Sequence, residues 1–322
     1  MNTMKISVII PVYNAEKYVS NAIESALQFE EVHEVILIED KSPDNALEVC
    51  KKMSEKYERV KLYQHPDKRN HGAGASRNLG IEKSSGEFIA FLDADDYFLP
   101  SRFDAEKELF KDPKVEGVYG ALGVHYYSEQ AKREYYPLFG DGLRTVYKRH
   151  EPKDVFPGQI YMLGVFGLFS IDCLTIRKEP LIRKMDFYFK PHLMLHEDTE
   201  FLFRLSYYLD LYPGIIEKAI AMRGVHENNR ITKVDGGTIN PALSKTILWR
   251  EVNHWSQLED RIPKDVKTHI KRMYYSYEIA KAPRLRKWGM IIKYLFTDYK
   301  NIRSGLYNIN FRKTLFNFSA SV

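Results

Sequence analysis

The sequence predicts an α/β fold, in which a mostly parallel sheet is flanked by helices and followed by a helical extension at the C-terminus. Short apolar runs alternate with amphipathic segments in the first third of the chain, at residues 5–12, 34–38, 60–64 and 88–92. This alternation is typical of βαβ units with right-handed crossovers. Acidic or glycine-containing segments follow the runs directly, and helical patterns dominate from residue 240 onward.

Composition limits the classes of protein that the chain can belong to. With 322 residues, 44% of them hydrophobic, the chain can form one large domain and an appendage. A mean hydropathy of −0.41 excludes an integral membrane bundle. The first apolar run contains Pro11 and no small-residue cleavage site, so it is not expected to be a signal peptide. Cys50 and Cys173 form neither a metal-binding spacing nor a disulfide framework, which favours reduced thiols in the cytoplasm.

The helices of the first half are predicted from periodicity and capping residues. Apolar residues recur on one face over residues 15–27. Ser42 followed by Pro43 predicts a second helix with a capping serine and a proline in its first position. Further helices are expected over residues 72–81 and from about Pro100.

The second half is less regular. Strands are expected within residues 115–127, 174–177 and 215–223, and a helix over residues 197–209. Residues 135–142 and 152–168 have loop-like composition, and the second of these segments is rich in Gly, Pro and aromatic residues, as a substrate-lining loop would be.

Three aspartates, Asp93, Asp95 and Asp96, follow the apolar run 88–92 directly. The carboxyl ends of parallel strands form the crevice in which open α/β sheets bind ligands. Residues two apart on an extended chain share a face, about 7 Å apart, so Asp93 and Asp95 are expected in one site and Asp96 away from it. Paired carboxylates favour a hard cation such as Mg²⁺ or Mn²⁺. The alternative is that these acids cap the next helix.

Polar residues also follow the other predicted strands. Tyr13 comes after Pro11 and Val12, and Asp40 ends the second run. Arg77 lies in a segment with two glycines and offers a bidentate grip on phosphate or carboxylate. Because strand ends converge in this topology, the set predicts a ligand with a base, a ribose and a diphosphate, which is a nucleoside diphosphate.

Four segments together resemble the family 2 glycosyltransferases of the GT-A fold, which has a Rossmann-type sheet. They are SVIIPVYN at residues 7–14, EVILIED at 34–40, GASRN at 74–78 and FLDADD at 91–96. The resemblance covers residues 4–126 closely and continues to about residue 232. Four motifs in the right order and spacing are specific, whereas any one of them alone would not be.

The resemblance implies roles for individual residues in binding a nucleotide-sugar donor, with a UDP-sugar expected first. Asp40 would bind the uracil, and residues 11–13 would contribute backbone and ring at the base. Asp93 would lie at the ribose side, with Ala94 also among the donor-binding residues. Asp95 would hold the cation, Mn²⁺ or Mg²⁺, that bridges the diphosphate.

The second motif departs from the usual Asp-Asp-Gly-Ser of the family, because Lys41 stands where glycine is usual. A lysine at this position predicts an unstrained backbone there, since left-handed conformations favour glycine. The departure bears on donor geometry near the base and not on Asp40 itself.

The segment HEDTEF at residues 196–201 resembles a second landmark of the family, an acidic pair that opens a helix. The aspartate of this pair, here Asp198, would be the general base, because an acceptor hydroxyl needs a proton acceptor before it can attack. The alternative is that these acids only stabilise the helix dipole, by ~0.3–1 kcal/mol.

His226, in the segment RGVHENNR, resembles the histidine that is a further metal ligand in some members of the family. Imidazole is an acceptable ligand for Mn²⁺, although carboxylate suits this ion better. A histidine with a purely structural role is the other interpretation.

The tail is basic. Residues 261–313 contain 14 Lys and Arg against 3 Asp and Glu, whereas the whole chain carries a net charge of +5. The pattern allows an interfacial helix that inserts Trp288, Ile291, Leu295 and Phe296 into a membrane leaflet. It equally allows a helical subdomain that packs on the catalytic domain or on a second copy of the chain. Nucleic-acid binding is not expected, because no known module is present.

The expected function is that of an inverting, metal-dependent glycosyltransferase that moves a hexosyl or N-acetylhexosaminyl group to a hydroxyl of a glycan or lipid-linked acceptor in cell-surface polysaccharide synthesis. Residues 1–126 would bind the donor, residues 127–235 the acceptor, and residues 236–322 would form the basic extension, with the protein in the cytoplasm or at the inner face of the membrane. Two alternatives remain open: a sugar-phosphate nucleotidylyltransferase, and a non-catalytic nucleotide- or glycan-binding protein.

Overall fold

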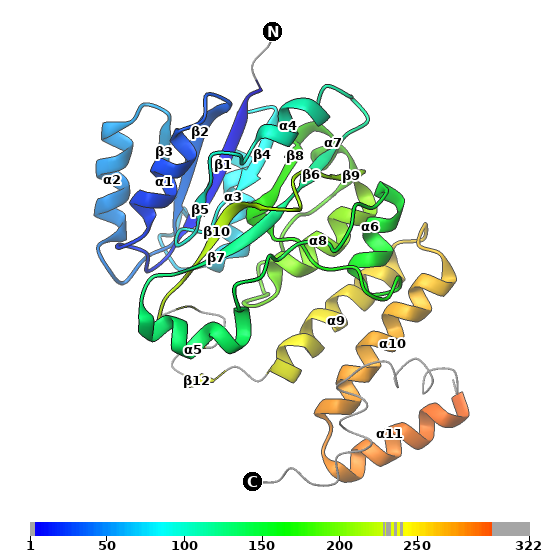
Figure 1. The fold of residues 1–322 in the computed structure, drawn as a ribbon. Coiled ribbons are helices and arrows are strands. Elements are labelled where there is room, and N and C mark those ends of the chain that lie inside the picture. Colours follow the sequence, from blue (N-terminus) through cyan, green and yellow to red (C-terminus); the bar gives the residue numbers. More distant parts are fainter. Residues whose placement is uncertain (1–3, 228, 230–232, 235–236, 239–240, 298–322) are drawn as a thin grey trace. The chain divides into compact units, whose positions relative to one another are not determined.

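A computed structural model describes residues 4–297, apart from 228, 230–232, 235–236 and 239–240 (Figure 1). Its internal contacts divide the chain into two compact units, Met1–Asn229 and Arg230–Val322. Each unit is described by itself.

The main sheet of the first unit has seven strands in the order β3-β2-β1-β4-β8-β6-β9. The neighbours β3, β2, β1 and β4 are parallel, β8 is antiparallel to both β4 and β6, and β9 is parallel to β6. The predicted mostly parallel sheet is confirmed. The strands are β1 (Ile6–Val12), β2 (Val32–Glu39), β3 (Val60–Gln64), β4 (Phe88–Phe91), β6 (Gly117–Tyr119), β8 (Leu174–Arg177) and β9 (Leu211–Pro213).

A second, three-stranded sheet has the order β5-β10-β7, with β5 (Tyr97–Phe98), β10 (Ala219–Val225) and β7 (Ala121–Tyr126). The strands β10 and β7 are parallel, and β5 is antiparallel to β10. On the other side of β7, Leu122 pairs with Arg144 in an isolated antiparallel bridge. This sheet therefore brings residues near 144 and 223 to the same small region.

Eight α-helices of the first unit connect these strands. They are α1 (Val19–Leu27), α2 (Ala46–Lys56), α3 (Gly72–Lys83), α4 (Asp104–Leu109), α5 (Glu129–Phe139), α6 (Pro152–Gln159), α7 (Lys178–Lys184) and α8 (Glu197–Tyr208). A 3₁₀ turn, η1 (Ile171–Cys173), precedes β8.

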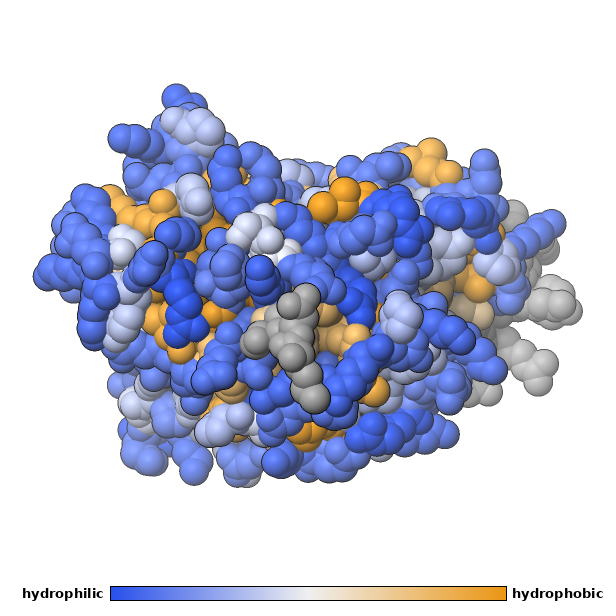
Figure 2. All heavy atoms as spheres, turned by 90° about the horizontal axis from the view of Figure 1, so that it is seen from above, coloured by the Kyte–Doolittle hydropathy of each residue, from blue (hydrophilic) through white to orange (hydrophobic). Residues whose placement is uncertain are grey.

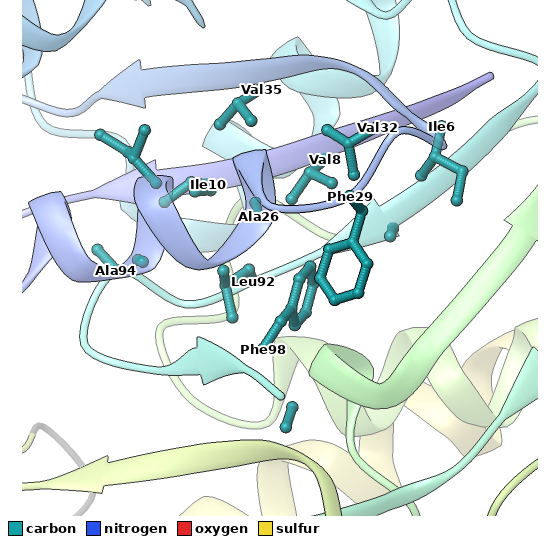
Figure 3. Packing of buried hydrophobic residues seen from close by; sticks show 14 of the residues in the cluster. Ile6, Val8, Ile10, Ala26, Phe29, Val32, Val35, Leu92, Ala94 and Phe98 are labelled. Atoms are coloured by element: carbon teal, nitrogen blue, oxygen red, sulfur yellow. The ribbon is translucent and has the colours of Figure 1, made fainter. Parts of the chain in front are cut away.

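The main sheet is buried on both faces. Successive side chains of its strands point to opposite sides, so neighbouring residues of one strand join different hydrophobic clusters. Val8 and Ile10 belong to a cluster with residues of α1 and α2, some of which Figure 3 shows. Ile9, between them, belongs to the opposite cluster with Ile81 of α3 and Phe201 of α8. The helices α1 and α2 thus cover one face of the sheet, and α3 and α8 cover the other (Figure 1).

Helix α3 lies very close to β1. A Cβ atom added at Gly80 would be 2.3 Å from Cγ2 of Ile9, which is shorter than any real contact of this kind. Only glycine permits this approach without a shift of the helix or strand. The close packing fixes the position of α3, which carries Arg77.

Helix α2 begins three residues later than Ser42 and Pro43 predict, at Ala46. The Ser42 N–H donates to Oε1 of Glu39 (2.6 Å), and Asp44 Oδ1 accepts from the Ala46 N–H (3.2 Å). Competing side-chain contacts with the backbone therefore keep residues 42–45 in a loop before the helix starts.

The segment 135–142 is mostly helical, contrary to its predicted loop character, because it contains the last turns of α5. The side chain of Ser128 caps this helix by accepting the Ala131 N–H (3.0 Å), and Pro137 lies inside it. The composition near Pro137 suggested a loop, but the cap and the burial of Tyr135 outweigh it. The segment 152–168 likewise begins with α6 before it becomes a loop.

The second unit contains α9 (Pro241–Leu258), α10 (Lys264–Lys281) and α11 (Arg284–Thr297), with short strands β11 (Lys233–Val234) and β12 (Gly237–Thr238). The helix breaks coincide with Pro263 and Pro283, as predicted. Ile291 of α11 is buried and packs in one cluster with Ile279 of α10, whereas Trp288 is 43% exposed. The side chains of Leu295 and Phe296 lie outside the described residues.

No helix in the described part of the chain is both long and apolar enough to span a bilayer. The face seen in Figure 2 is mainly hydrophilic, and its apolar residues form small patches separated by polar ones. Scattered apolar side chains of this kind are normal on a protein surface.

Candidate active site

The ends of β1 and β2 are joined by backbone contacts, as the sequence predicts for a nucleotide site. The Asp40 N–H donates to the Val12 carbonyl (2.9 Å). Tyr13, the next residue after β1, is 50% exposed, so its ring has a free face. Pro11, Val12, Tyr13 and Asp40 therefore lie together at one edge of the sheet.

The Asp40 carboxylate is almost fully buried and fixes the start of α3. Its two oxygens accept the N–H groups of His71 and Gly72, each at 2.7 Å. Burial raises the pKa of Asp40, and these two hydrogen bonds oppose the rise. The carboxylate thus orders the loop that leads to Arg77. Its predicted contact with a base stays a prediction.

Lys41 has a φ of +57°, so the predicted unstrained backbone at this position is wrong. The adjoining Glu39–Ser42 hydrogen bond closes a tight turn, which explains the left-handed conformation. Asn14 has a φ of +54°, and its N–H donates to Oγ of Ser42 (3.2 Å). A non-glycine residue in this conformation costs roughly 1–2 kcal/mol.

The three aspartates after β4 lie in a turn and not on an extended chain. The Asp96 N–H donates to the Asp93 carbonyl (3.0 Å), which brings Asp96 back toward Asp93. Carboxylate oxygens of Asp93, Asp96 and Asp172 all lie within 4.8 Å of one another. The expectation that Asp96 faces away from the site was wrong, because the strand ends before these residues.

Crowding of these acids changes their protonation. Burial, with the charge of Asp172 as the second cause, raises the pKa of Asp93 to about 7. The same two causes raise the pKa of Asp96 well above its ordinary value. The side chains of Asp172 and Asp96 are fixed by backbone donors. Asp172 Oδ1 accepts the Asp93 N–H (3.0 Å), and Asp96 Oδ1 accepts the Gly224 N–H (2.9 Å).

Arg77 forms hydrogen bonds both to the residue that follows β4 by two positions and to the first residue of helix α8. Its guanidinium donates to Oδ1 of Asp93 (2.6 Å) and to Oε1 of Glu197 (3.3 Å), and its side chain is 3% exposed. Of the two partners expected for Arg77, phosphate or carboxylate, the structure shows carboxylate. Arg77 therefore fixes the position of Asp93.

Asp95 meets His226 from the end of β10. Nε2 of His226 lies 3.1 Å from Oδ2 of Asp95, and the Asn229 side chain donates to the same oxygen (3.1 Å). The His226 ring is stacked on Tyr18, with 4.4 Å between centroids. A Cβ atom at Gly224 would lie 1.9 Å from the Asp95 carbonyl oxygen, so glycine is required for this approach.

The two residues predicted as metal ligands, Asp95 and His226, are thus brought together. A carboxylate and an imidazole at this distance are a donor pair that would fit Mn²⁺ or Mg²⁺. His226 is only 6% exposed, so its orientation is set by packing.

Asp198 lies in the first turn of α8, next to Glu197. Its Oδ1 accepts the N–H (2.6 Å) and the hydroxyl (3.2 Å) of Thr199. Burial alone would raise the pKa of Asp198, but the charges of Arg144, Arg77 and His196 and the hydrogen bond from the Thr199 N–H together lower it. The carboxylate is therefore ionised near neutral pH, as a general base must be.

Three charged residues of the site were not identified from the sequence as part of it: Asp172, Arg144 and Arg223. Asp172 lies in η1 and Arg144 in the segment between α5 and α6. Neither follows a motif or a predicted strand end, so the sequence held no signal for them. Arg223 begins the segment that contains His226, but its position there does not reveal that it lies near Asp96 and Asp172.

Comparison with known proteins gives a family match. The sequence model described as "Glycosyl transferase family 2" matches residues 7–173, which include the β1, β2 and β4 ends and Asp172.

The relatives match about a third of the chain. A protein of Haemophilus influenzae described as an uncharacterized glycosyltransferase is 42% identical over 107 residues, or 33% of this chain and 42% of its own length. The poly(ribitol-phosphate) beta-glucosyltransferase of Bacillus spizizenii is 39% identical over 97 residues, which are 29% of this chain and 15% of its own length. The matched region therefore spans less than half of either relative.

Among solved structures, S. aureus TarS 1–349 in complex with UDP-GlcNAc matches with a TM-score of 0.62 and 20% identity, over 97% of this chain and 81% of that chain. The same protein in complex with UDP matches with a TM-score of 0.58 and 19% identity, over the same shares of both chains. At this level of identity the likeness shows the fold alone, and the predicted GT-A-like class is confirmed.

Proposed function

Because this chain belongs to glycosyl transferase family 2, we propose that it moves a sugar from a UDP-sugar to a hydroxyl of a cell-surface glycan or lipid-linked acceptor, with inversion at the anomeric carbon. One observation carries the proposal: the Arg77 guanidinium binds Asp93 at the end of β4 and Glu197, the neighbour of Asp198, at the start of α8. The proposed donor site and the proposed base are therefore only one side chain apart.

The names of similar proteins support the donor and the acceptor class. TarS was solved with UDP-GlcNAc, and the Bacillus spizizenii relative is a glucosyltransferase that acts on poly(ribitol-phosphate). A UDP-linked hexose or N-acetylhexosamine and a polymer of the cell surface are thus the first substrates to test.

In this proposal the uracil is held by Pro11, Val12, Tyr13 and Asp40. The ribose side of the donor is held by Asp93 and Ala94. Tyr13 offers an exposed ring for stacking, and Asp40 keeps residues 71 and 72 in place. Arg77 positions Asp93 through the 2.6 Å hydrogen bond.

Asp95 and His226 would hold the divalent cation, Mn²⁺ or Mg²⁺. Asp93 and Asp96 suit this role less well, because Arg77 already binds Asp93 and the Gly224 N–H donates to Asp96. When bound, the cation supplies positive charge that stabilises the departing diphosphate.

Asp198 would accept the proton of the acceptor hydroxyl as its oxygen attacks the anomeric carbon on the face opposite the diphosphate. Its lowered pKa keeps the carboxylate ionised and ready for this step. The Thr199 N–H and hydroxyl fix one of its oxygens and leave the other for the substrate.

The remaining parts of the chain complete the proposal. Residues 1–126 would form the donor half, residues 127–235 the acceptor half and residues 236–322 a basic extension. Location in the cytoplasm at the inner face of the membrane, with the extension at the lipid surface or against a second copy, would place the enzyme near a lipid-linked acceptor.

The experiment is a release assay with the full chain. UDP release from UDP-glucose and UDP-GlcNAc is measured with Mn²⁺, with Mg²⁺ and with chelator. The proposal expects release that needs a divalent cation and that stops in Asp95→Asn. An absence of release and of UDP binding with every donor would contradict it. UDP binding without any release would favour the non-catalytic alternative.

A further inference from the structure

The mechanism above gives no substrate contact to two arginines of the first unit, Arg144 and Arg223. Both are only partly exposed. No hydrogen bond or ion pair joins either guanidinium to any described residue, although Arg77, Arg102 and Arg204 in the same unit are all tied to carboxylates. A buried or half-buried cation without a direct partner is costly, so a nearby anion is expected to complete it.

Strand pairing places the two side chains on one face of the second sheet. Leu122 of β7 pairs with Arg144 on one side and with Ala221 of β10 on the other. Arg223 is two residues after Ala221, and residues two apart on a strand share a face. The two arginines are thus diagonal neighbours across β7.

The position of each arginine is fixed by its surroundings. Two backbone hydrogen bonds hold Arg144 against Leu122, at 2.8 and 3.1 Å. The Arg223 guanidinium lies over the Phe139 ring, 5.4 Å from its centroid. The backbone of Arg144 and the guanidinium of Arg223 therefore have defined positions.

Charge places the pair beside the proposed base. The two arginines act on each other, and the charge of Arg223 adds to burial in lowering the pKa of Arg144. Of the acids that act on Arg144, Asp198 has the largest effect, followed by Asp172. For Arg223 the strongest acids are Asp96 and Asp172. Among the described residues neither arginine lies within ion-pair distance of these carboxylates, so both guanidinium groups keep N–H donors for a further anion.

We propose that Arg144 and Arg223 form an oxyanion subsite for the acceptor, so that the hydroxyl that is glycosylated belongs to a molecule with a phosphate or carboxylate group close to it. This inference rests on the proposed function and names the acceptor class. A guanidinium presents paired N–H donors that match either oxyanion in a bidentate geometry.

The acceptor, and not the donor, is the source of this anion because of the position of Asp198. A general base must lie within hydrogen-bond distance of the hydroxyl that it deprotonates. Of the acids that act on Arg144, this proposed base has the largest effect. A group bound by Arg144 is therefore next to the acceptor oxygen.

The test measures binding of small anions to the full chain. Methyl phosphate and acetate are titrated by NMR and calorimetry into the free chain and into the chain loaded with UDP and Mn²⁺, with methanol as the neutral probe. We expect methyl phosphate or acetate, but not methanol, to bind, and Arg144→Gln or Arg223→Gln to weaken that binding at least tenfold. The relative affinity of the two anions distinguishes a phosphate from a carboxylate acceptor.

Two variants control for folding and for charge alone. Arg183→Gln removes an exposed cation of α7 that is 58% exposed and pairs with Glu179, so it should leave anion binding unchanged. Arg144→Lys keeps the charge but loses the paired donors, and should weaken binding less than Arg144→Gln does. Thermal denaturation of every variant reports whether it is folded.

Three results would overturn the inference: no anion binding to the wild-type chain, anion binding that is the same in folded Arg144→Gln, or a loss of UDP affinity in Arg144→Gln as large as the loss for the anion. A preference for UDP-glucuronate over UDP-glucose that disappears in Arg144→Gln would also overturn it, since the anion would then belong to the donor sugar. Anion binding to the free chain is measured without UDP and tests this inference alone. A chain that binds no UDP would instead show that the proposed function is wrong.

Discussion

The two sides of the site are built in different ways. On the proposed donor side, hydrogen bonds hold each acid directly: Asp40 accepts two backbone N–H groups, and Asp95 contacts His226 and Asn229. On the proposed acceptor side, Thr199 alone donates hydrogen bonds to Asp198, and Arg144 acts on it through space, with no ion pair between them among the described residues. Side chains held by hydrogen bonds suit a ligand with a constant structure, such as UDP. Arginines without an ion pair can instead bind a charged group of the acceptor.

This contrast predicts that substitutions on the two sides affect different steps. Donor-side changes should alter UDP affinity, and acceptor-side changes should alter turnover, its pH dependence or acceptor choice.

The largest effect is expected for Asp198→Asn. The amide cannot accept the acceptor proton, so kcat should fall by about 10²–10⁴-fold, the usual contribution of a general base. UDP affinity should change little, because the donor residues lie elsewhere. Transfer rates and calorimetric UDP titrations check this, and turnover near the wild-type rate would remove Asp198 as the base.

Tyr13→Ala should give the opposite pattern on the donor side. The exposed ring is expected to stack on the base, and stacking of this kind contributes ~1–3 kcal/mol, or about 5- to 150-fold in affinity. UDP affinity should fall by that range while kcat at saturating donor is nearly unchanged. Tyr13→Phe is the matched control and should bind UDP as the wild type does.

Arg144→Gln should shift the pH dependence of turnover. Burial raises the pKa of Asp198, and Arg144 is the first of the charges that lower it. Because the base works only when ionised, loss of Arg144 should move the acidic limb of the pH–rate profile to higher pH. The profile of donor hydrolysis measures this shift, with Arg183→Gln as the control, and an unmoved limb would show that Arg144 does not act on the base.

The smallest effect is expected for Lys41→Gly. This substitution removes the backbone strain of a lysine with positive φ next to the proposed uracil site. The free energy of unfolding should rise by less than about 1 kcal/mol, because the greater flexibility of unfolded glycine offsets part of the relief. Lys68→Gly, at a φ of +52°, should behave similarly in thermal denaturation. A loss of UDP affinity in Lys41→Gly alone would show that the lysine side chain contacts the donor.

The sequence revealed the donor side far better than the acceptor side. Residues 11–13, Asp40 and Asp95 follow apolar runs of a parallel sheet, whose topology alone brings strand ends together. Arg144 and Asp172 reach the site through an isolated bridge and a 3₁₀ turn, which leave no periodic signal. The turn at Asp93–Asp96 was also not predicted. The residues of this segment do not distinguish a turn with an i to i+3 hydrogen bond from an extended chain.

Local propensity failed where side chains compete with the backbone. Asp44 and Glu39 delay the start of α2, and the Ser128 cap starts α5 ahead of a proline that suggested a loop. The helices of the second unit were located correctly, because Pro263 and Pro283 interrupt long periodic segments.

The most direct test of the account is a calorimetric titration of UDP into wild-type chain and Asp95→Asn, each with Mn²⁺ and with chelator. The account predicts that Mn²⁺ strengthens UDP binding to the wild type at least tenfold and that Asp95→Asn loses this gain while it keeps the weaker, metal-free affinity. Equal UDP affinity in all four titrations would contradict a metal-assisted diphosphate site at Asp95 and His226.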